Sequence, residues 1–122
     1  GFNLGQNDIY IYKAKKILKN KILGITCHNS IKLAKYASSN GANYIALGAF
    51  YKTRTKKVIH KADIKTLNKI KKSVKIPVVA IGGINHKNYK KLLLNKADFL
   101  AISGYIWNNK KFKPHQAIKK LI

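Results

Sequence analysis

Small residues close two apolar segments of this chain, and residues of this kind are suited to binding a phosphate group. The segment 78–81 is followed by Gly82 and Gly83, and the segment 98–102 is followed by Ser103. Glycines let backbone N–H groups approach an anion closely, and a serine hydroxyl adds a hydrogen bond. A Gly-Gly pair is equally typical of a plain tight turn. Because small residues close two successive segments, we favour a phosphate site.

The segment 48–57 interleaves hydroxyl groups with cations, in the order Thr53, Arg54, Thr55 and Lys56. Cations neutralise the charge of a diphosphate and hydroxyls donate to its oxygens, so this chemistry needs no acid-base group. The alternative is an ordinary basic loop in a chain rich in lysine. We interpret the segment as a candidate diphosphate loop.

Asp8 follows the first apolar segment and is one of only three carboxylates in the chain. Mg²⁺ prefers oxygen ligands of this kind and usually bridges to a substrate phosphate. Asp8 is therefore a candidate Mg²⁺ ligand. The alternative, which is compatible with the first, is that Asp8 caps the helix that follows it.

Another apolar segment, 22–26, leads into Thr26, Cys27 and His28. Side chains alternate along a strand, so Thr26 and His28 are expected on one side and Cys27 on the other. This argues against a catalytic Cys-His pair. His28 either contacts a substrate or serves as a structural hydrogen-bond donor, and we favour the structural role.

Alternating strands and helices are expected to position these residues, as in folds with parallel βαβ units. The apolar runs predict strands at 1–4, 22–26, 43–47, 78–81 and 98–102. Helical periodicity and capping residues predict helices at 8–19, from Asn29 or Ser30 to Asn40-Gly41, at 64–74 after Asp63, at 86–95 after Asn85, and after Pro114. This spacing fits both a doubly wound sheet and a (β/α)₈ barrel.

Charge and composition narrow the class of protein. The formal net charge is +23, but Arg54 is the single arginine among 26 basic residues, and the lysines occur in every predicted helix. Base-reading proteins usually need arginine, so we expect a solvated basic surface and disfavour nucleic-acid binding. The single Cys27 indicates a reduced, cytoplasmic setting. No apolar run approaches the roughly 20 residues of a membrane span.

Five strings in order resemble the thiamine phosphate synthase family. The family's strings are G-x-H-L-G-Q-x-D, G-V-S-x-H, G-P-x-F-x-T-x-T-K, V-V-A-I-G-G-I and V-S-A-I. Here they correspond to residues 1–8, 24–28, 48–56, 78–84 and 102–106. The resemblance implies a TIM-type (β/α)₈ barrel, of which residues 1–122 supply about the last five βα units. It also implies a transferase that joins hydroxymethylpyrimidine diphosphate to thiazole phosphate and releases diphosphate with Mg²⁺.

The resemblance also implies a role for individual residues. Asp8 corresponds to a metal ligand, and Thr26 stands where the family has a serine that meets the diphosphate. Lys56 and Thr26 would act in catalysis. The diphosphate or pyrimidine side would contact Thr53, Thr55 and Lys56, and the thiazole phosphate would contact Gly82, Gly83, Ile102 and Ser103.

Besides Thr26 in place of serine, three further departures from the family strings are visible, namely Asn3 in place of histidine and Ala49 and Lys52 where proline is common. No counterpart of the family's first three strands is present, and a whole barrel needs roughly 250 residues. We therefore expect these 122 residues to be part of a longer protein, inactive alone and able to form homo-oligomers. Two rival functions remain, a thiazole tautomerase that uses His28 and a binder of nucleic acid or anionic surfaces. Thr53, Thr55 and Lys56 favour the synthase, because a tautomerase binds no diphosphate.

Overall fold

The computed structural model describes residues 1–53 and 60–122, and the described residues form a five-stranded parallel sheet. The strands are β1 (Phe2–Leu4), β2 (Leu23–His28), β3 (Tyr44–Leu47), β4 (Val78–Ile81) and β5 (Phe99–Ala101). Their order in the sheet is the order in the chain, β1-β2-β3-β4-β5. A doubly wound sheet would reverse direction partway across, so the order identifies a barrel-type arrangement.

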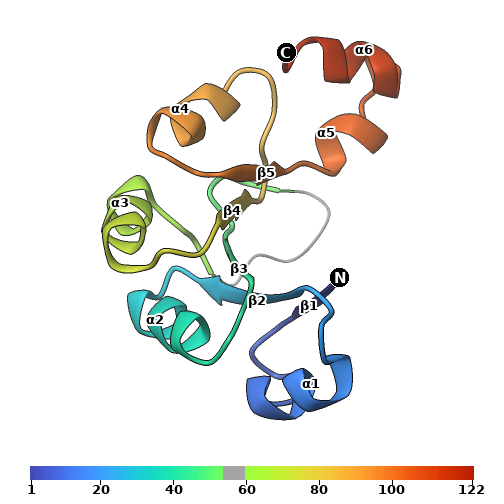
Figure 1. Ribbon diagram of the computed structural model, residues 1–122. Helices are drawn as coiled ribbons and strands as arrows, with labels where there is room; N and C mark the ends of the chain where they lie inside the picture. The colour runs from blue at the N-terminus through green and yellow to red at the C-terminus, as the bar shows by residue number, and fades with distance from the viewer. Residues whose placement is uncertain (54–59) are drawn as a thin grey trace.

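Helices follow the strands and cover the sheet from outside. They are α1 (Ile11–Leu18), α2 (Ile31–Ser39), α3 (Ile64–Ser73), α4 (Tyr89–Leu94), α5 (Gly104–Trp107) and α6 (Pro114–Lys119). Figure 1 shows α1 to α4 in an arc around the strands, as in part of a βα barrel. In the part of the chain that the structure describes, no helix is long and apolar enough to cross a membrane.

The core lies between the sheet and these helices. Each strand sends alternate side chains towards the helices, and in the three central strands these are almost fully buried. They are Leu23, Ile25 and Cys27 of β2, Ile45 and Leu47 of β3, and Val78 and Ala80 of β4. Leu67 and Ile70 of α3 and Leu92 of α4 complete the core from the helix side. The alternating period of the strands thus fixes which face the helices cover.

The opposite face of the sheet is the concave one, and it is only partly covered by the described residues. Val79 pairs with Phe99 and Ile81 with Ala101. Phe99 is 60% exposed and Ile81 is 43% exposed. In a closed barrel these positions fill the interior. Strands β1 and β5 are the two edges of the described sheet.

The first helix begins later than the sequence predicted. It starts at Ile11 with Tyr10 as its N-cap residue, and no side chain caps it. Asp8 instead accepts a hydrogen bond from the Gly5 N–H, at 2.6 Å from its Oδ2. The expectation that Asp8 caps this helix was therefore wrong, because a separate turn over Gly5–Asp8 precedes the helix.

The cap at Asn85 was also wrong, since α4 begins at Tyr89 after Asn88. Asn85 and Asn88 close a turn between them, in which the Asn85 N–H donates to Asn88 Oδ1 at 2.8 Å. Either asparagine could cap the start of this helix, since both have cap-forming side chains. The turn from Asn85 to Asn88 moves the start of the helix to Tyr89. The short helix α5 was not predicted, because it has only four residues.

Candidate functional site

The parallel, sequential sheet gathers the candidate residues along one edge. All five strands run in the same direction, so the segment that follows each strand lies at the same edge of the sheet. In order across the sheet, this edge carries Asp8, Thr26 near the end of β2, the described parts (48–53 and 60–62) of the β3–α3 loop (residues 48–62), Gly82 with Gly83, and Ser103. This is the edge at which barrel enzymes bind substrates.

Thr26 lies at the centre of a small polar network between β1 and β2. The Asn3 side-chain amide donates to Thr26 Oγ1 at 3.0 Å, and the Gln6 amide donates to the Thr26 carbonyl at 2.6 Å. Because the hydroxyl oxygen accepts from Asn3, the hydroxyl hydrogen remains to be donated to another group. Asn3 therefore orients Thr26 as a donor.

Asp8 is exposed at the same edge, beside the Thr26 network. One carboxylate oxygen accepts from the Gly5 N–H, which fixes the orientation of the carboxylate. Among the described residues, no group of three or more His, Cys, Asp or Glu side chains gathers as a metal cluster. A single carboxylate still fits Mg²⁺, which usually takes one or two carboxylates together with water and substrate phosphate.

The β3–α3 loop begins with a stem, Ala49–Lys52, that is hydrogen-bonded to the end of β4. The Phe50 N–H donates to the Ile81 carbonyl and the Tyr51 N–H donates to the Gly82 carbonyl, both at 3.1 Å. Thr53 follows this stem directly, so it lies beside the end of β4. Thr55 and Lys56 lie outside the described residues, and their proposed contacts stay predictions.

Gly82 and Gly83 are required for this close approach of the loop. Both have positive φ angles, 104° and 63°. A Cβ atom at Gly82 would lie 2.3 Å from the Ala49 Cβ, and one at Gly83 would lie 2.4 Å from the Lys52 carbonyl oxygen. The glycines therefore have a packing reason of their own, in addition to the phosphate contact predicted from the sequence.

The end of β5 adjoins the end of β4, so Ile102 and Ser103 lie next to the glycine turn. Ile102 packs against the core, and Ser103 is exposed as the N-cap residue of α5 without a side-chain capping bond. The Ser103 carbonyl accepts from the Ile106 and Trp107 N–H groups, both at 3.0 Å. The backbone of Ser103 is thereby fixed while its side chain stays exposed.

The structure adds two contacts that the sequence did not predict, between the end of β2 and the end of the β3–α3 loop. The imidazole rings of His28 and His60 stack with centroids 3.9 Å apart. Asn29 and Asp63 exchange two hydrogen bonds, of 3.3 and 3.1 Å. The available signal was that Asn29, directly after β2, and Asp63, directly before α3, both have cap-forming side chains. No periodicity connects His28 with His60.

His28 is not placed by simple alternation along β2. The register shifts between Thr26 and His28, and His28 has a positive φ of 54°. Its pKa is lowered by burial and by the neighbouring His60. Cys27 is fully buried on the helix side, and burial raises its thiol pKa to about 12. The prediction that Cys27 and His28 form no catalytic pair agrees with this geometry, since the thiol is neutral and enclosed.

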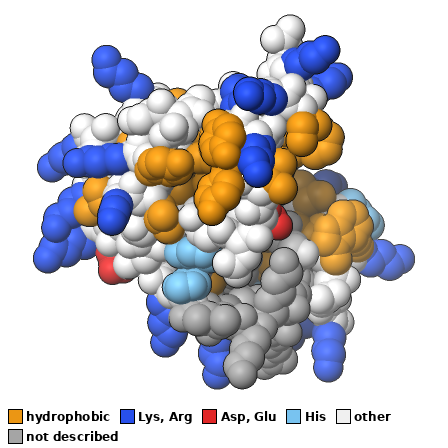
Figure 2. Space-filling view, turned by 90° about the horizontal axis from the view of Figure 1, so that it is seen from below, with side chains coloured by type: hydrophobic (Ala, Val, Ile, Leu, Met, Phe, Trp, Pro, Cys, Tyr) orange, Lys and Arg blue, Asp and Glu red, His pale blue; other side chains and the backbone are white. Residues whose placement is uncertain are grey.

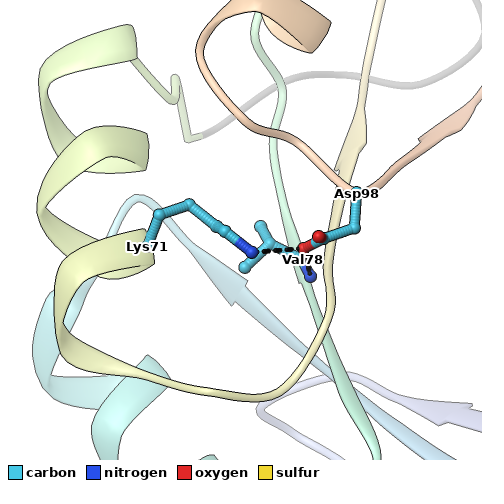
Figure 3. Close-up of polar contacts among 3 residues, drawn as sticks. All are labelled: Lys71, Val78 and Asp98. Atoms are coloured by element: carbon cyan, nitrogen blue, oxygen red, sulfur yellow. Dashed lines mark hydrogen bonds and ion pairs between the residues drawn. The ribbon is translucent and has the colours of Figure 1, made fainter.

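The other two carboxylates have structural roles. Asp63 is the N-cap residue of α3, and hydrogen bonds from the Thr66 backbone and side chain are the main cause of its lowered pKa. Asp98, shown in Figure 3, accepts from Lys71 Nζ at 2.6 Å and from the Val78 N–H at 2.7 Å. Burial would raise the pKa of Asp98, but these donors outweigh it and the pKa is lowered. Asp63 and Asp98 are thus both held in structural contacts.

The lysines do not form a single stripe on the face shown in Figure 2. In Figure 2, Lys and Arg side chains project mainly from the periphery of the face in view, and apolar side chains lie nearer its centre.

Known proteins match this chain over nearly all of its length. The family model described as thiamine monophosphate synthase matches residues 1–106. The thiamine-phosphate synthase of Pelagibacter ubique is 64% identical over 121 residues, which are 99% of this chain and 58% of that protein. The thiamine-phosphate synthase of Clostridium acetobutylicum is 41% identical over 114 residues, covering 93% of this chain and 54% of that protein. The chain spans about half the length of the curated relatives it matches.

Solved structures agree with the sequence matches. The thiamine phosphate pyrophosphorylase from Pyrococcus furiosus superimposes with a TM-score of 0.87 at 34% identity, covering 99% of this chain and 56% of that one. A 3-hexulose-6-phosphate synthase superimposes with a TM-score of 0.72 at 16% identity, covering 98% of this chain and 58% of that one. The second likeness concerns the fold alone.

Proposed function

This chain belongs to the thiamine monophosphate synthase family, and on that premise we propose that the protein joins a hydroxymethylpyrimidine diphosphate to a thiazole phosphate. One observation carries the proposal. A single edge of the sheet presents Thr26, the β3–α3 loop, the Gly82–Gly83 turn and Ser103 in the order of the family's strings. A bond forms between the pyrimidine methylene carbon and the thiazole nitrogen. The bond from that carbon to the diphosphate oxygen breaks, and its electron pair leaves with the diphosphate.

The leaving diphosphate needs charge neutralisation and hydrogen-bond donors. We assign this role to Thr26, Thr53, Thr55 and Lys56. The network around Thr26 supports the assignment. The Thr26 hydroxyl oxygen accepts a hydrogen bond from the Asn3 amide, and the hydroxyl hydrogen can be donated to the diphosphate. The thiazole nitrogen already has an electron pair, so positioning matters more than a general base.

Asp8 would supply one oxygen ligand to Mg²⁺. Its carboxylate is exposed at the correct edge and oriented by the Gly5 N–H. When bound, the metal would neutralise negative charge on the diphosphate. The other ligands would come from water, from the substrate and from outside the described residues.

The thiazole phosphate would bind at the ends of β4 and β5, at Gly82, Gly83, Ile102 and Ser103. Backbone N–H groups at a glycine turn and the exposed Ser103 hydroxyl are suitable donors for a phosphate. The position of Thr53 beside the end of β4 supports a short separation between this phosphate and the diphosphate.

The synthase is favoured over the thiazole tautomerase, because the relatives reported above are named thiamine-phosphate synthases. His28 was the residue that suggested the tautomerase as an alternative function, and its imidazole ring stacks on that of His60. We also propose a cytoplasmic location, supported by the buried, reduced Cys27, since free thiols are typical of reducing compartments. A homo-oligomer is a further part of the proposal.

The test is an assay of the purified protein that contains these residues, with both substrates and Mg²⁺. Formation of thiamine phosphate with equimolar diphosphate release is expected. Isomerisation of a thiazole carboxylate phosphate without use of the pyrimidine diphosphate would identify a tautomerase instead. Binding of DNA or RNA that weakens steeply with salt, with no turnover, would favour the nucleic-acid alternative.

A further inference from the structure

The end of β2 is connected to the far end of the β3–α3 loop by side chains to which the proposed function gives no role. These are His28 and Asn29 on one side and His60 and Asp63 on the other, and we name the four residues the β2 clasp. We propose that the β2 clasp is a positioning device that sets the distance between Thr26 and the described start of the β3–α3 loop (residues 49–53), so that Thr26 and Thr53 contact one diphosphate. The proposal rests on the proposed function, and it names residues that tune substrate affinity at that same site.

The two contacts of the clasp are different in kind and adjacent in sequence. His28 stacks on His60 with the ring planes 29° apart, and Asn29 both donates to the Asp63 carboxylate and accepts from the Asp63 N–H. A reciprocal pair of bonds fixes orientation as well as distance, because both groups of the Asn29 amide are used. The contact therefore specifies one geometry between β2 and the loop end.

The loop end that the clasp holds is itself paired with the loop start. The Ala49 N–H donates to the His60 carbonyl at 3.1 Å, and the Ala62 N–H donates to the Ala49 carbonyl at 2.8 Å. Ala49 also begins the stem that is bonded to the end of β4. These two backbone hydrogen bonds join the two ends of the loop, and the clasp connects the joined ends to β2.

The backbone at His28 supports a specific role for this contact. A positive φ is unfavourable for a residue with a Cβ, and at His28 it coincides with the irregularity in β2 two residues after Thr26. Such backbone conformations persist where the surroundings fix them, and they are frequent at binding sites. Here the conformation accompanies the stack on His60, immediately after the donor hydroxyl of Thr26.

Asp63 links the clasp to the helical layer. Its Oδ1 accepts from the Thr66 N–H at 2.7 Å as the cap of α3, while its Oδ2 and its own N–H bond to Asn29. Substituting Asp63 would therefore damage the helix as well as the clasp. Asn29 and His60 are the better positions for a test, since neither caps a helix in the structure.

The experiment measures steady-state kinetics of N29A, H60A and H60F in the protein that contains these residues, varying each substrate in turn. Loss of a hydrogen-bonded contact of this kind is worth about a tenfold change at most. We expect N29A and H60A to raise KM for the pyrimidine diphosphate by about fivefold, with KM for the thiazole phosphate changed by less than about twofold. H60F keeps a flat ring for the stack and should restore most of the affinity.

Asn68→Ala is the matched control. The Asn68 amide in α3 donates a hydrogen bond of 3.2 Å to the side-chain oxygen of Asn95, away from the strand ends. This substitution should change neither KM. If N29A and H60A lower thermal stability and leave the ratio of the two KM values as in N68A, the clasp is only structural and the proposal is overturned. Equal effects in H60A and H60F would overturn the stacking part.

Failure of the proposed function gives a different result, namely no thiamine phosphate from the unsubstituted protein. In that case the Kd of inorganic diphosphate with Mg²⁺, measured by calorimetry in the same variants, still decides the clasp. A Kd raised in N29A and H60A and restored in H60F supports it, and an unchanged Kd overturns it.

Discussion

Substituting Gly82 by alanine is the most informative single change at the candidate site, because the structure specifies its cost. Gly82 has a φ of 104°, and an added Cβ would lie 2.3 Å from the Ala49 Cβ and 2.6 Å from the Ala49 Cα. Ordinary contact begins near 3.4 Å, so Ala49 or the turn must move by about 1 Å. The atoms that would be met are the Cα and Cβ of Ala49, which are fixed to the backbone of the β3–α3 loop. No flexible side chain can therefore absorb the movement.

Two terms add to the cost of this substitution. A residue with a Cβ in the left-handed region costs about 1–2 kcal/mol relative to glycine. Overpacking at a closely packed site costs about 1–3 kcal/mol. We therefore expect G82A to lower the free energy of unfolding by about 2–5 kcal/mol, measured by urea denaturation of the protein that contains these residues.

Gly5→Ala is the control for G82A. A Cβ at Gly5 would meet only the Asp8 carboxylate at 3.4 Å, and its φ lies outside the range that favours glycine. We expect G5A to change the free energy of unfolding by less than about 0.5 kcal/mol. If G82A is as mild as G5A, the close contact between Gly82 and Ala49 is wrong, and so is the packing reason for the glycine turn.

Four further outcomes are expected. Lys56→Ala should lower turnover with the pyrimidine diphosphate by about 10²–10³-fold while thiazole phosphate binding stays near normal, because a cation matters most as charge separates. Lys75→Ala is the control, since Lys75 is exposed at the opposite edge of the sheet. A rise in the thiazole phosphate KM alone in Lys56→Ala would contradict the assignment. Ser103→Ala should act mainly on thiazole phosphate, raising its KM by roughly tenfold or more, since a hydrogen bond to a charged group contributes about 1.5–3 kcal/mol. Asp98→Asn should destabilise the protein at neutral pH by about 1 kcal/mol or less, as for a partly exposed ion pair. Because the pKa of Asp98 is lowered in the folded protein, this contribution is present above pH 3.8 and should shrink as pH falls through the folded value. A difference that does not change with pH in urea denaturation would contradict this. The pKa of His28 lies below its usual 6.5 because of burial and the neighbouring His60. The neutral form of His28 therefore contributes stability above pH 6.5, and this stability is lost as pH falls through the folded pKa. H60A should raise the pKa of His28 in an NMR titration, and an unchanged pKa would exclude the coupling.

Most of the fold followed from local signals in the sequence. Each strand was predicted within about two residues, since short apolar runs between turn residues specify buried parallel strands well. The cap at Asp63 was also correct. The errors were at Asp8 and Asn85, where a polar residue that can cap a helix instead closes a turn before it. Capping chemistry and turn chemistry use the same side chains, so the sequence alone does not separate them.

The site was predictable only where residues follow the strands directly. Asp8, Thr26, Gly82, Gly83 and Ser103 lie at one edge because the strands are parallel, which the βαβ pattern predicted. Their order along that edge follows the sequential strand order, which the pattern left open. The contacts that cross between loops were not predictable. His28 stacks on His60 at the point where the register of β2 shifts after Thr26, and no local pattern encodes that irregularity.

The glycine turn shows how far a motif can be interpreted as chemistry. Gly82 and Gly83 were first interpreted as phosphate contacts, yet each is also required because the loop backbone packs against it. A loss of activity in G82A would therefore not demonstrate a phosphate site, since Ala49 and the loop would move as well. Ser103 separates the two explanations, because its side chain is exposed and its backbone bonds survive truncation to alanine. If S103A weakens thiazole phosphate binding without loss of stability, the phosphate interpretation stands independently of the packing role of the glycines.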